Sequence, residues 1–320
     1  MNVIAITGAT GFIGDHLLDQ LVHRKDIQLR ILIHKNINNK ILNRNNIKII
    51  EGDLLKSETL NKFIIPRCTV VNLVYLSGRS KQESLSAIAN LAEACAKAKI
   101  KRFIHCSTAV VAGRVPNKVI DENTKCNPIS EYEITKLAVE NILLEKYSSS
   151  FEVAILRPTA VFGPGGKNLL KLANDLRYGN RIINYLKSCL VNYRKMNLVY
   201  IDNVVSSIAF LIDTDKKIDR EIFIVSDDEY HANNYRDIEQ YLMKSFGYKN
   251  YLLPRVPLPF FLLIFLLKLA GKSNLNPTSV YDCQKLLRAG FKKPVLFKEG
   301  LAYFTDWYKI KFCGNQGSNN

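Results

Sequence analysis

Apolar and polar positions alternate regularly along the first half of the chain. Short runs rich in Val, Ile and Phe predict buried strands, and these runs lie at 3–7, 28–34, 47–51, 69–76, 102–107 and 151–156. Between the runs, helix-like spacing predicts helices at 12–23, 83–98 and 130–147. Because strands that alternate with helices form a parallel sheet covered on both faces, we expect an α/β fold with a doubly wound parallel sheet.

The second half of the chain follows a less regular pattern. The pattern predicts helices at 169–178, 204–214 and 234–246 and strands at 198–201 and 221–225. Both strands are suited to extending the main sheet, and we expect the one near 198–202 to return to it. The second half therefore indicates a smaller lobe that is partly interleaved with the first.

The longest apolar run extends over 258–267 and ends at Lys268. This run is too short for a helix that spans a membrane, which needs about 20 apolar residues. We interpret it as a buried helix of the second lobe. The alternative is a helix that lies on a membrane surface, a position that the cations Lys268 and Lys272 would suit.

Composition adds one unusual quantity, the net charge. The chain has 320 residues and carries 45 Lys and Arg against 29 Asp and Glu, a net charge of +16. Apolar residues make up 47%, which excludes a disordered chain. The cations are scattered, and clusters such as Arg194-Lys195 and Lys292-Lys293 are only pairs. We therefore expect no nucleic-acid partner and ascribe the charge to background composition, with an anionic substrate as a compatible second reason.

Cysteine and histidine positions bear on metal sites and on the compartment. The seven cysteines contain no CxxC pair, and the five histidines form no HExxH arrangement. We therefore expect neither a disulfide framework nor a metal site. The chain enters its first strand directly after Met1, without the pattern of a signal peptide, so we expect a cytoplasmic protein.

A glycine-rich string, TGATGFIG at 7–14, joins the first strand to the first helix. Gly8 permits a tight turn, Gly11 lets the backbone approach a pyrophosphate, and Gly14 allows close packing of helix on strand. The helix that begins with Phe12 and Ile13 offers free N–H groups and the positive end of its dipole to the same pyrophosphate. At this junction the string predicts a dinucleotide-binding loop.

The ends of the next two strands bear on which dinucleotide binds. The second strand ends in His34 and Lys35, without an acidic residue to hold a ribose 2′-hydroxyl, which favours NADP and leaves NAD as the alternative. The third strand is followed by Asp53 and Leu54. Asp53 is placed to accept a hydrogen bond from the adenine amine, and its other interpretation is a helix N-cap.

Three residues further along indicate proton-transfer chemistry. Thr108 follows the strand at 102–107, and Tyr132 and Lys136 stand four residues apart in a predicted helix, on one face. A phenol with a pKa near 10 is a poor base at neutral pH. A neighbouring ammonium and an oxidised nicotinamide would both favour the phenolate, while Thr108 orients the same substrate oxygen. Lys136 is also placed to reach the nicotinamide ribose.

In this order along the chain, these motifs resemble those of the extended short-chain dehydrogenase/reductases, the NAD(P)-dependent epimerase/dehydratase group. Three further stretches are similar to family signatures: LRPTAVFGPG at 156–165, VYIDNV at 199–204, and LLRAGF at 286–291 with its continuation to Tyr308. The resemblance implies a Rossmann fold, a nicotinamide cofactor and a nucleoside-diphosphate sugar substrate. It divides the chain into a dinucleotide-binding domain at 1–165, a substrate-binding lobe at 166–313 and a flexible tail at 314–320.

The resemblance also implies roles for single residues. Pro158 is expected to contact the cofactor, and Asn168 the substrate. Met196 stands where many members carry an arginine for the substrate diphosphate, so Arg194, on the same side of the strand, is the expected replacement. Ala112 replaces a substrate-facing tyrosine. A homodimer is expected to form through the helices at 83–98 and 130–147.

Within this group the chain is most similar to bacterial nucleotide-sugar 4-epimerases and 4-ketoreductases of surface-polysaccharide pathways, and the motifs are the same for both reactions. One alternative is a reductase of an apolar alcohol or ketone, similar to the 3β-hydroxysteroid dehydrogenases and associated with a membrane. Another is a cofactor-sensing regulator without activity, which the presence of Thr108, Tyr132 and Lys136 disfavours.

Overall fold

The computed structural model describes residues 2–34, 46–256, 259–269, 271 and 276–313. The predictions for Lys35, Leu258, Lys272 and the tail at 314–320 lie outside these residues.

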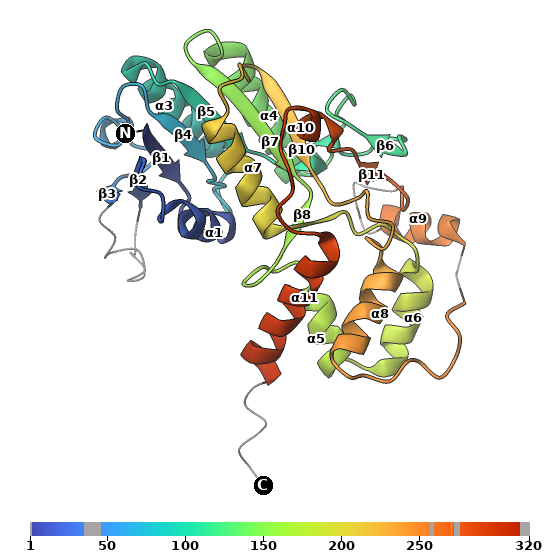
Figure 1. The fold of residues 1–320 in the computed structure, drawn as a ribbon. Coiled ribbons are helices and arrows are strands. Elements are labelled where there is room, and N and C mark those ends of the chain that lie inside the picture. The colour runs from blue at the N-terminus through green and yellow to red at the C-terminus, as the bar shows by residue number, and fades with distance from the viewer. Residues whose placement is uncertain (1, 35–45, 257–258, 270, 272–275, 314–320) are drawn as a thin grey trace.

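A parallel sheet forms the centre of the molecule (Figure 1). Its strands are β1 (Asn2–Thr7), β2 (Ile27–Ile33), β3 (Ile47–Glu51), β4 (Thr69–Asn72), β5 (Arg102–Cys106), β7 (Glu152–Pro158) and β10 (Glu221–Val225). They lie in the order β3-β2-β1-β4-β5-β7-β10, and each neighbouring pair is parallel. The chain places β1, β2 and β3 side by side in one direction, and after β3 it crosses to the other side of β1 to form β4. This reversal confirms the doubly wound sheet.

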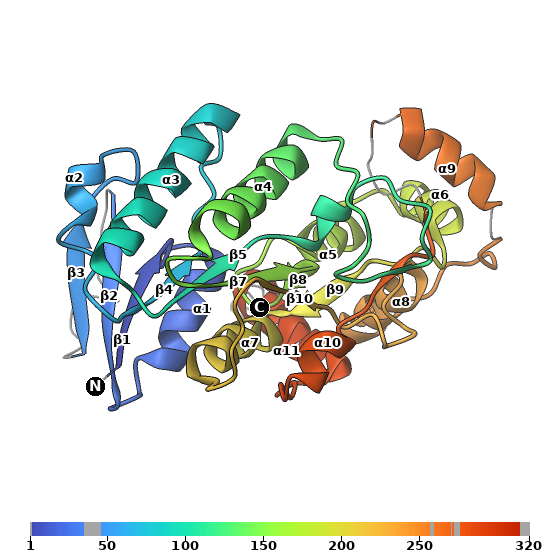
Figure 2. The same ribbon diagram turned by 90° about the horizontal axis from the view of Figure 1, so that it is seen from above.

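Helices cover both faces of the sheet (Figure 2). The helices α3 (Lys81–Ala98) and α4 (Glu131–Ile142) lie on one face, and α1 (Phe12–Leu21) and α7 (Ile201–Asp213) lie on the other. Side chains alternate along each strand accordingly, because successive strand residues point to opposite faces. In β1, Ile4 and Ile6 join the core beneath α1 and α7, whereas Ala5 joins the core beneath α3 and α4.

The second lobe contains most of the remaining elements. Its helices are α5 (Leu170–Tyr178), α6 (Arg181–Val191), α8 (Tyr235–Ser245), α9 (Phe260–Leu269) and α11 (Phe297–Tyr308). Two short helices, α2 (Ser57–Leu60) and α10 (Gln284–Arg288), flank the main sheet. The hydrophobic pattern did not predict α6, which begins where Asn180 accepts hydrogen bonds from the N–H groups of Ile182 and Ile183.

The prediction that a strand near 198–202 returns to the main sheet was wrong. The strand β9 (Leu198–Tyr200) pairs instead with β8 (Ala160–Phe162), which continues the chain just beyond β7. The position beside β7 is taken by β10, as the pattern at 221–225 had indicated. A second short pair joins β6 (Val119–Ile120) to β11 (Val280–Tyr281). The lobes are interleaved because β10, from the second half of the chain, completes the main sheet.

The interpretation of the apolar run as a buried helix was also wrong for most of its length. Within α9 only Leu263 and Leu267 are buried, while Phe261 and Leu269 are 73% and 70% exposed. The helix lies at the outer edge of the second lobe, where few elements cover it (Figures 1 and 2). In the described part of the chain, no helix has both the length and the apolar character needed to cross a membrane.

Candidate active site

The glycine string forms a tight cradle between β1 and α1. Gly8 has φ +76°, a conformation that favours glycine. A Cβ atom on Gly14 would lie 2.3 Å from the carbonyl oxygen of Gly8, so no larger residue fits there. Gly11 occupies the N-cap of α1 and has no side chain to cap it, so the first N–H groups of the helix, at Phe12 and Ile13, face the cradle. A backbone cradle at an uncapped helix N-terminus fits a pyrophosphate.

Beside the cradle, the second and third strands end in an interacting pair. The exposed His34 Nε2 lies 3.2 Å from Asp53 Oδ2. The other carboxylate oxygen of Asp53 accepts a hydrogen bond from the Leu55 N–H at 2.9 Å. Asp53 therefore stabilises the turn at 53–55. The alternative interpretation as a helix N-cap was wrong, because the helix α2 begins at Ser57 and has Lys56 at its N-cap. Leu54 is buried and lines a small cavity together with Lys136.

The structure brings Thr108, Tyr132 and Lys136 together at the carboxyl edge of the sheet. Thr108 follows β5, and its side chain is close enough to Tyr132 to influence the pKa of the phenol. Lys136 is 5% exposed, and its Nζ donates to the carbonyl oxygen of Cys106 at 3.2 Å. A capping box of Ser130 and Glu133 fixes the start of α4, so Tyr132 stands in the first turn and Lys136 in the second.

A fourth side chain, Tyr75, contacts this group, and the sequence analysis missed it. Its ring meets the Tyr132 ring edge-on, with centroids 4.8 Å apart, and lies 5.5 Å from Lys136 Nζ. We expected a strand over 69–76, but β4 ends at Asn72 and the following residues leave the sheet. The position just after a parallel strand was the available signal, because ligands of such sheets bind at the carboxyl ends of the strands.

Burial shifts the pKa values of both Tyr132 and Lys136. It raises the pKa of Tyr132 to about 12, and the nearby Cys106, Tyr75 and Glu133 act in the same direction, while the hydrogen bond with Thr108 opposes them. Burial also lowers the pKa of Lys136. We expected Lys136 to lower the pKa of Tyr132, and the loss of water around the phenol is the larger effect here.

A chain of polar side chains crosses the strand ends next to Lys136. Thr7 Oγ1 donates to Asn72 Oδ1 at 2.6 Å, and Asn72 Nδ2 lies 3.1 Å from His105 Nδ1. Burial and the charge of Lys136 lower the pKa of His105 well below its usual value, so the ring is neutral at neutral pH. Within the described residues, His105 Nε2 and Ser107 Oγ are buried without a hydrogen-bond partner. Unpaired polar atoms of this kind, beside a glycine cradle, fit a dinucleotide with many polar groups.

Two neighbouring cavities lie on the side of the second lobe. The larger, about 450 Å³, contains Asn168, Lys167, Lys171 and Lys187 among its lining residues. Asn168 Nδ2 donates to the carbonyl oxygen of Val161 at 2.7 Å, so its side chain also holds the loop before α5. Asp175 lines the same cavity and pairs with Lys171 and Lys187 at 2.9 and 3.2 Å, so two of the three lysines are already balanced by a carboxylate.

The smaller cavity, about 190 Å³, contains Arg194, Val110 and Thr159 among its lining residues. Ala160, Met196 and Tyr235 line both cavities. Arg194 and Val110 thus line one cavity, and this cavity adjoins the larger one that contains Asn168. Pro158, which the resemblance assigns to the cofactor, is buried at the end of β7.

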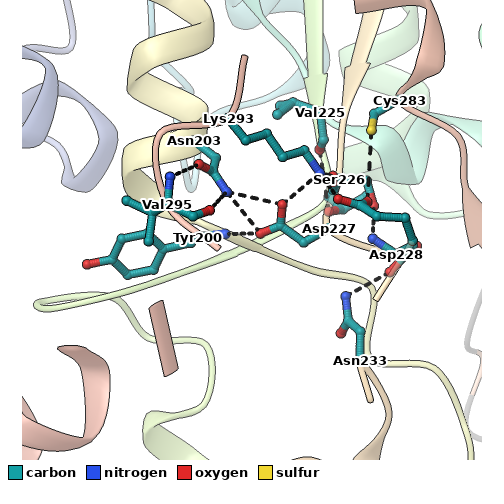
Figure 3. A network of polar contacts seen from close by, with 12 residues as sticks. Tyr200, Asn203, Val225, Ser226, Asp227, Asp228, Asn233, Cys283, Lys293 and Val295 are labelled. Atoms are coloured by element: carbon teal, nitrogen blue, oxygen red, sulfur yellow. Dashed lines mark hydrogen bonds and ion pairs between the residues drawn. The ribbon is translucent and has the colours of Figure 1, made fainter. Parts of the chain in front are cut away.

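A buried network joins the end of β10 to the second lobe (Figure 3). Asp227 accepts hydrogen bonds from the Tyr200 N–H and from Asn203, at 2.9 and 3.1 Å, and pairs with Lys293 Nζ at 2.9 Å. Asp228 accepts from the Tyr281 N–H, Asn197 and Asn233 at 2.6–2.9 Å. Burial raises the pKa of Asp228 to about 6. The two carboxylates thus tie β9, α7 and β11 to the main sheet.

Comparisons with known proteins agree with this geometry. A model of the NAD dependent epimerase/dehydratase family matches residues 4–226. The UDP-glucose 4-epimerase of Vibrio cholerae is 26% identical over 331 residues, which cover 93% of this chain and 92% of that protein.

Two solved structures share the fold. The dTDP-glucose 4,6-dehydratase of Bacillus anthracis, in complex with NAD, superimposes with a TM-score of 0.75 at 16% identity and covers 98% of both chains. The UDP-glucose 4-epimerase of Thermotoga maritima, with UDP-glucose, gives a TM-score of 0.73 at 19% identity and covers 97% of this chain and 99% of that one.

Proposed function

Because the chain belongs to the NAD dependent epimerase/dehydratase family, we propose that it binds NAD and acts at C4 of a nucleoside-diphosphate sugar. The observation that carries the proposal is the juxtaposition of Thr108, Tyr132 and Lys136 at the sheet edge beside the glycine cradle. Relatives named for UDP-glucose and dTDP-glucose support the substrate class.

In this proposal the cofactor lies along the carboxyl edge of the sheet. Gly8, Gly11 and Gly14, with the N–H groups of Phe12 and Ile13, hold the pyrophosphate, and His34, Asp53, Leu54 and Pro158 line its two ends. NAD supplies the acceptor for a hydride when it is bound. The end of the second strand favoured NADP in the sequence analysis. We propose NAD instead, because the related dehydratase was solved in complex with NAD.

The chemistry assigned to the chain is proton transfer at the C4 oxygen. Tyr132 accepts the hydroxyl proton as the C4 hydrogen leaves as hydride, and it returns a proton when the C4 carbonyl is reduced again. Thr108 donates to the same oxygen and orients it. The positive charge of Lys136 stabilises the phenolate electrostatically. Asn168 and Arg194, in the adjacent cavities, are assigned to the sugar nucleotide, with Arg194 on the diphosphate.

Epimerisation is the reaction that the full-length relative favours, and 4-keto reduction uses the same residues. Either product would serve surface-polysaccharide synthesis. The assay offers a panel of UDP- and dTDP-sugars and their 4-keto derivatives to the purified protein. Conversion of a sugar to its C4 epimer without net NADH consumption is expected, whereas steady NADH consumption would assign the reductase. Turnover of an apolar alcohol or ketone, with none of any sugar nucleotide, would contradict the proposal.

The cofactor is tested separately from the turnover. In Gly14→Ala the new Cβ collides with backbone atoms of Gly8 and Ala9. We expect NAD release in the mass spectrum of the denatured wild-type protein and a loss of NAD affinity of at least tenfold in the variant. Lys97→Ala is the control, because Lys97 is exposed on the helix α3, where an alanine is readily accommodated. Equal affinity in both variants would exclude the cradle as the pyrophosphate site.

A further inference from the structure

Exposed apolar side chains stand on α9 and on the segment before it, and together we refer to them as the apolar surface. We define it by Leu252, Leu253 and Val256 and by three residues of α9, Phe261, Phe265 and Leu269. Leu252 is 98% exposed, and each of the others is more than half exposed. Soluble proteins scatter single exposed apolar residues, but so many bulky ones within eighteen positions mark an interaction site.

The helix α9 presents two apolar faces. Leu263 and Leu267, one turn apart, pack inward, while Phe261, Phe265 and Leu269 follow one another at the same spacing on the opposite side. Lys268 is the one polar residue of its ten positions. A surface helix of a globular protein normally turns charged side chains to water, so the outer face of α9 lacks the composition of a solvated face.

The segment before α9 is held firmly in place. Tyr185 Oη donates to the carbonyl oxygen of Pro254 at 2.9 Å, and Arg255 donates to Ser188 Oγ at 2.8 Å and pairs with Glu239 at 3.1 Å. These contacts bind the segment to α6 and α8. The same helix α6 exposes Ile182 and Leu186, one turn apart. Leu253 and Val256, which flank Pro254 and Arg255, are therefore held in place against the second lobe.

The charge of the chain is concentrated in the same region. The stretches 176–201 and 240–281, which contain α6 and α9, hold ten of the 45 Lys and Arg and none of the 29 Asp and Glu. Two of the ten, Lys187 and Arg255, pair with Asp175 and Glu239, which stand directly before the two stretches, and the other eight are an excess of positive charge along this part of the sequence. The sequence analysis treated the excess as background, and the lack of acidic residues in these two stretches places part of it near α6 and α9 along the sequence.

We infer that this apolar surface docks on an anionic lipid bilayer. Exposed Phe and Leu side chains enter the boundary between headgroups and acyl chains, and the surrounding Lys and Arg side chains attract the headgroups. A second copy of the chain would bring an equally positive surface and be repelled. The inference goes beyond the proposed function, since it concerns where the protein acts rather than what it converts.

The docked orientation has a consequence for access to the site. Ile264 of α9 lines a cavity together with Arg114, Val115 and Pro116. This loop continues the turn that starts at Thr108. Docking through α9 would therefore place the substrate side of the active site close to the bilayer surface.

The test is co-sedimentation of the full chain with vesicles of 70% phosphatidylcholine and 30% phosphatidylglycerol, with pure phosphatidylcholine vesicles alongside. We expect binding to the mixed vesicles that weakens at high salt, and at least tenfold weaker binding to phosphatidylcholine alone. Replacing Phe261 and Phe265 by Ser should reduce the partition coefficient at least tenfold, since each loses an inserted ring. Ile310→Ser is the matched control, because Ile310 is 79% exposed outside this surface.

Folding of each variant is checked by its thermal unfolding midpoint, which should stay close to that of the wild type because the replaced rings are exposed. Absence of binding to the mixed vesicles by the folded wild-type protein would overturn the inference, as would equal binding of the double variant. A dimer in sedimentation velocity that dissociates in the double variant would also overturn it, because it would assign the surface to a second copy. Weaker vesicle binding in Lys268→Glu would support it.

Discussion

At the scale of single residues, the site depends on how little water reaches two ionisable groups. Tyr132 and Lys136 lose hydration in the same place, so the pKa of the phenol moves up and that of the ammonium moves down. Both shifts favour the neutral pair. In the proposed function, the positive charge of an oxidised nicotinamide would oppose this effect of burial and favour the phenolate.

Tyr132→Phe tests the proton-transfer role at this scale. The variant keeps the ring and its contact with Tyr75 but has no proton to exchange, so we expect kcat to fall by about 10²–10⁴-fold. NAD affinity should change little. The measurement is single-turnover conversion of the sugar nucleotide identified by the panel, with NAD binding followed in parallel. A rate within a few-fold of wild type would assign the proton transfer to another group.

Residue spacing does not reveal every member of the site. Tyr75 and His105 belong to different strand ends and share no motif with Tyr132. They reach Lys136 because β4 and β5 are neighbours in the sheet. Their proximity follows from strand order, which a linear sequence encodes only through the whole fold.

At the scale of elements, α4 carries Tyr132 and Lys136, to which we assign the proton transfer, and must be held against the sheet. The guanidinium of Arg157, on β7, donates to both carboxylate oxygens of Glu140, on α4, at 2.6–3.2 Å. Both side chains are buried. The sequence analysis found Arg157 only within a family signature, and the structure shows that it joins this helix to β7.

Arg157→Met is expected to destabilise the protein by about 3–5 kcal/mol, because Glu140 stays buried without its partner. Urea unfolding at pH 7 measures the free energy of unfolding. The double variant Arg157→Met/Glu140→Leu removes both charges and should recover most of the loss. If the single variant were as stable as the wild type, the pair would not hold α4.

At the scale of the whole molecule, the lobes are joined through buried carboxylates rather than through a continuous apolar core alone. Asp227 and Asp228 stand at the end of β10 and accept hydrogen bonds from β9, α7 and β11 (Figure 3). Asn197 and Tyr281, whose N–H groups donate to Asp228, line the cavity with Arg194. The network therefore sets the geometry of the substrate side.

Asp228→Asn should lower the free energy of unfolding at pH 7 by about 1–3 kcal/mol, because an amide N–H would face the donors that the carboxylate accepts from. The pKa of Asp228 is raised to about 6 in the folded state, so folding takes up a proton. The wild type should therefore gain stability relative to the variant as the pH falls from about 6 to 4.

Urea unfolding of both proteins between pH 4 and 7 gives the difference in their free energies of unfolding. The expected result is a difference that widens on acidification. If this difference in the free energy of unfolding became smaller as the pH falls, the pKa of Asp228 would be lowered in the folded state, because its hydrogen-bond donors would stabilise the ionised carboxylate.

The sequence by itself determined the features that depend on one element or one junction. The glycine loop could be predicted because a strand, a tight turn and a helix follow one another without a gap. The Tyr132–Lys136 pair could be predicted because one helix turn sets its spacing. The alternation of strands and helices likewise predicted the parallel sheet, since each element must bury an apolar face.

The tertiary structure decided what depends on neighbours from elsewhere in the chain. It placed β10 rather than β9 beside β7, brought Tyr75 and His105 to Lys136, and left one face of α9 uncovered. An apolar run has the same composition whether another element covers it or not. Only the packing of the other elements determines whether such a side chain enters the core or remains at the surface.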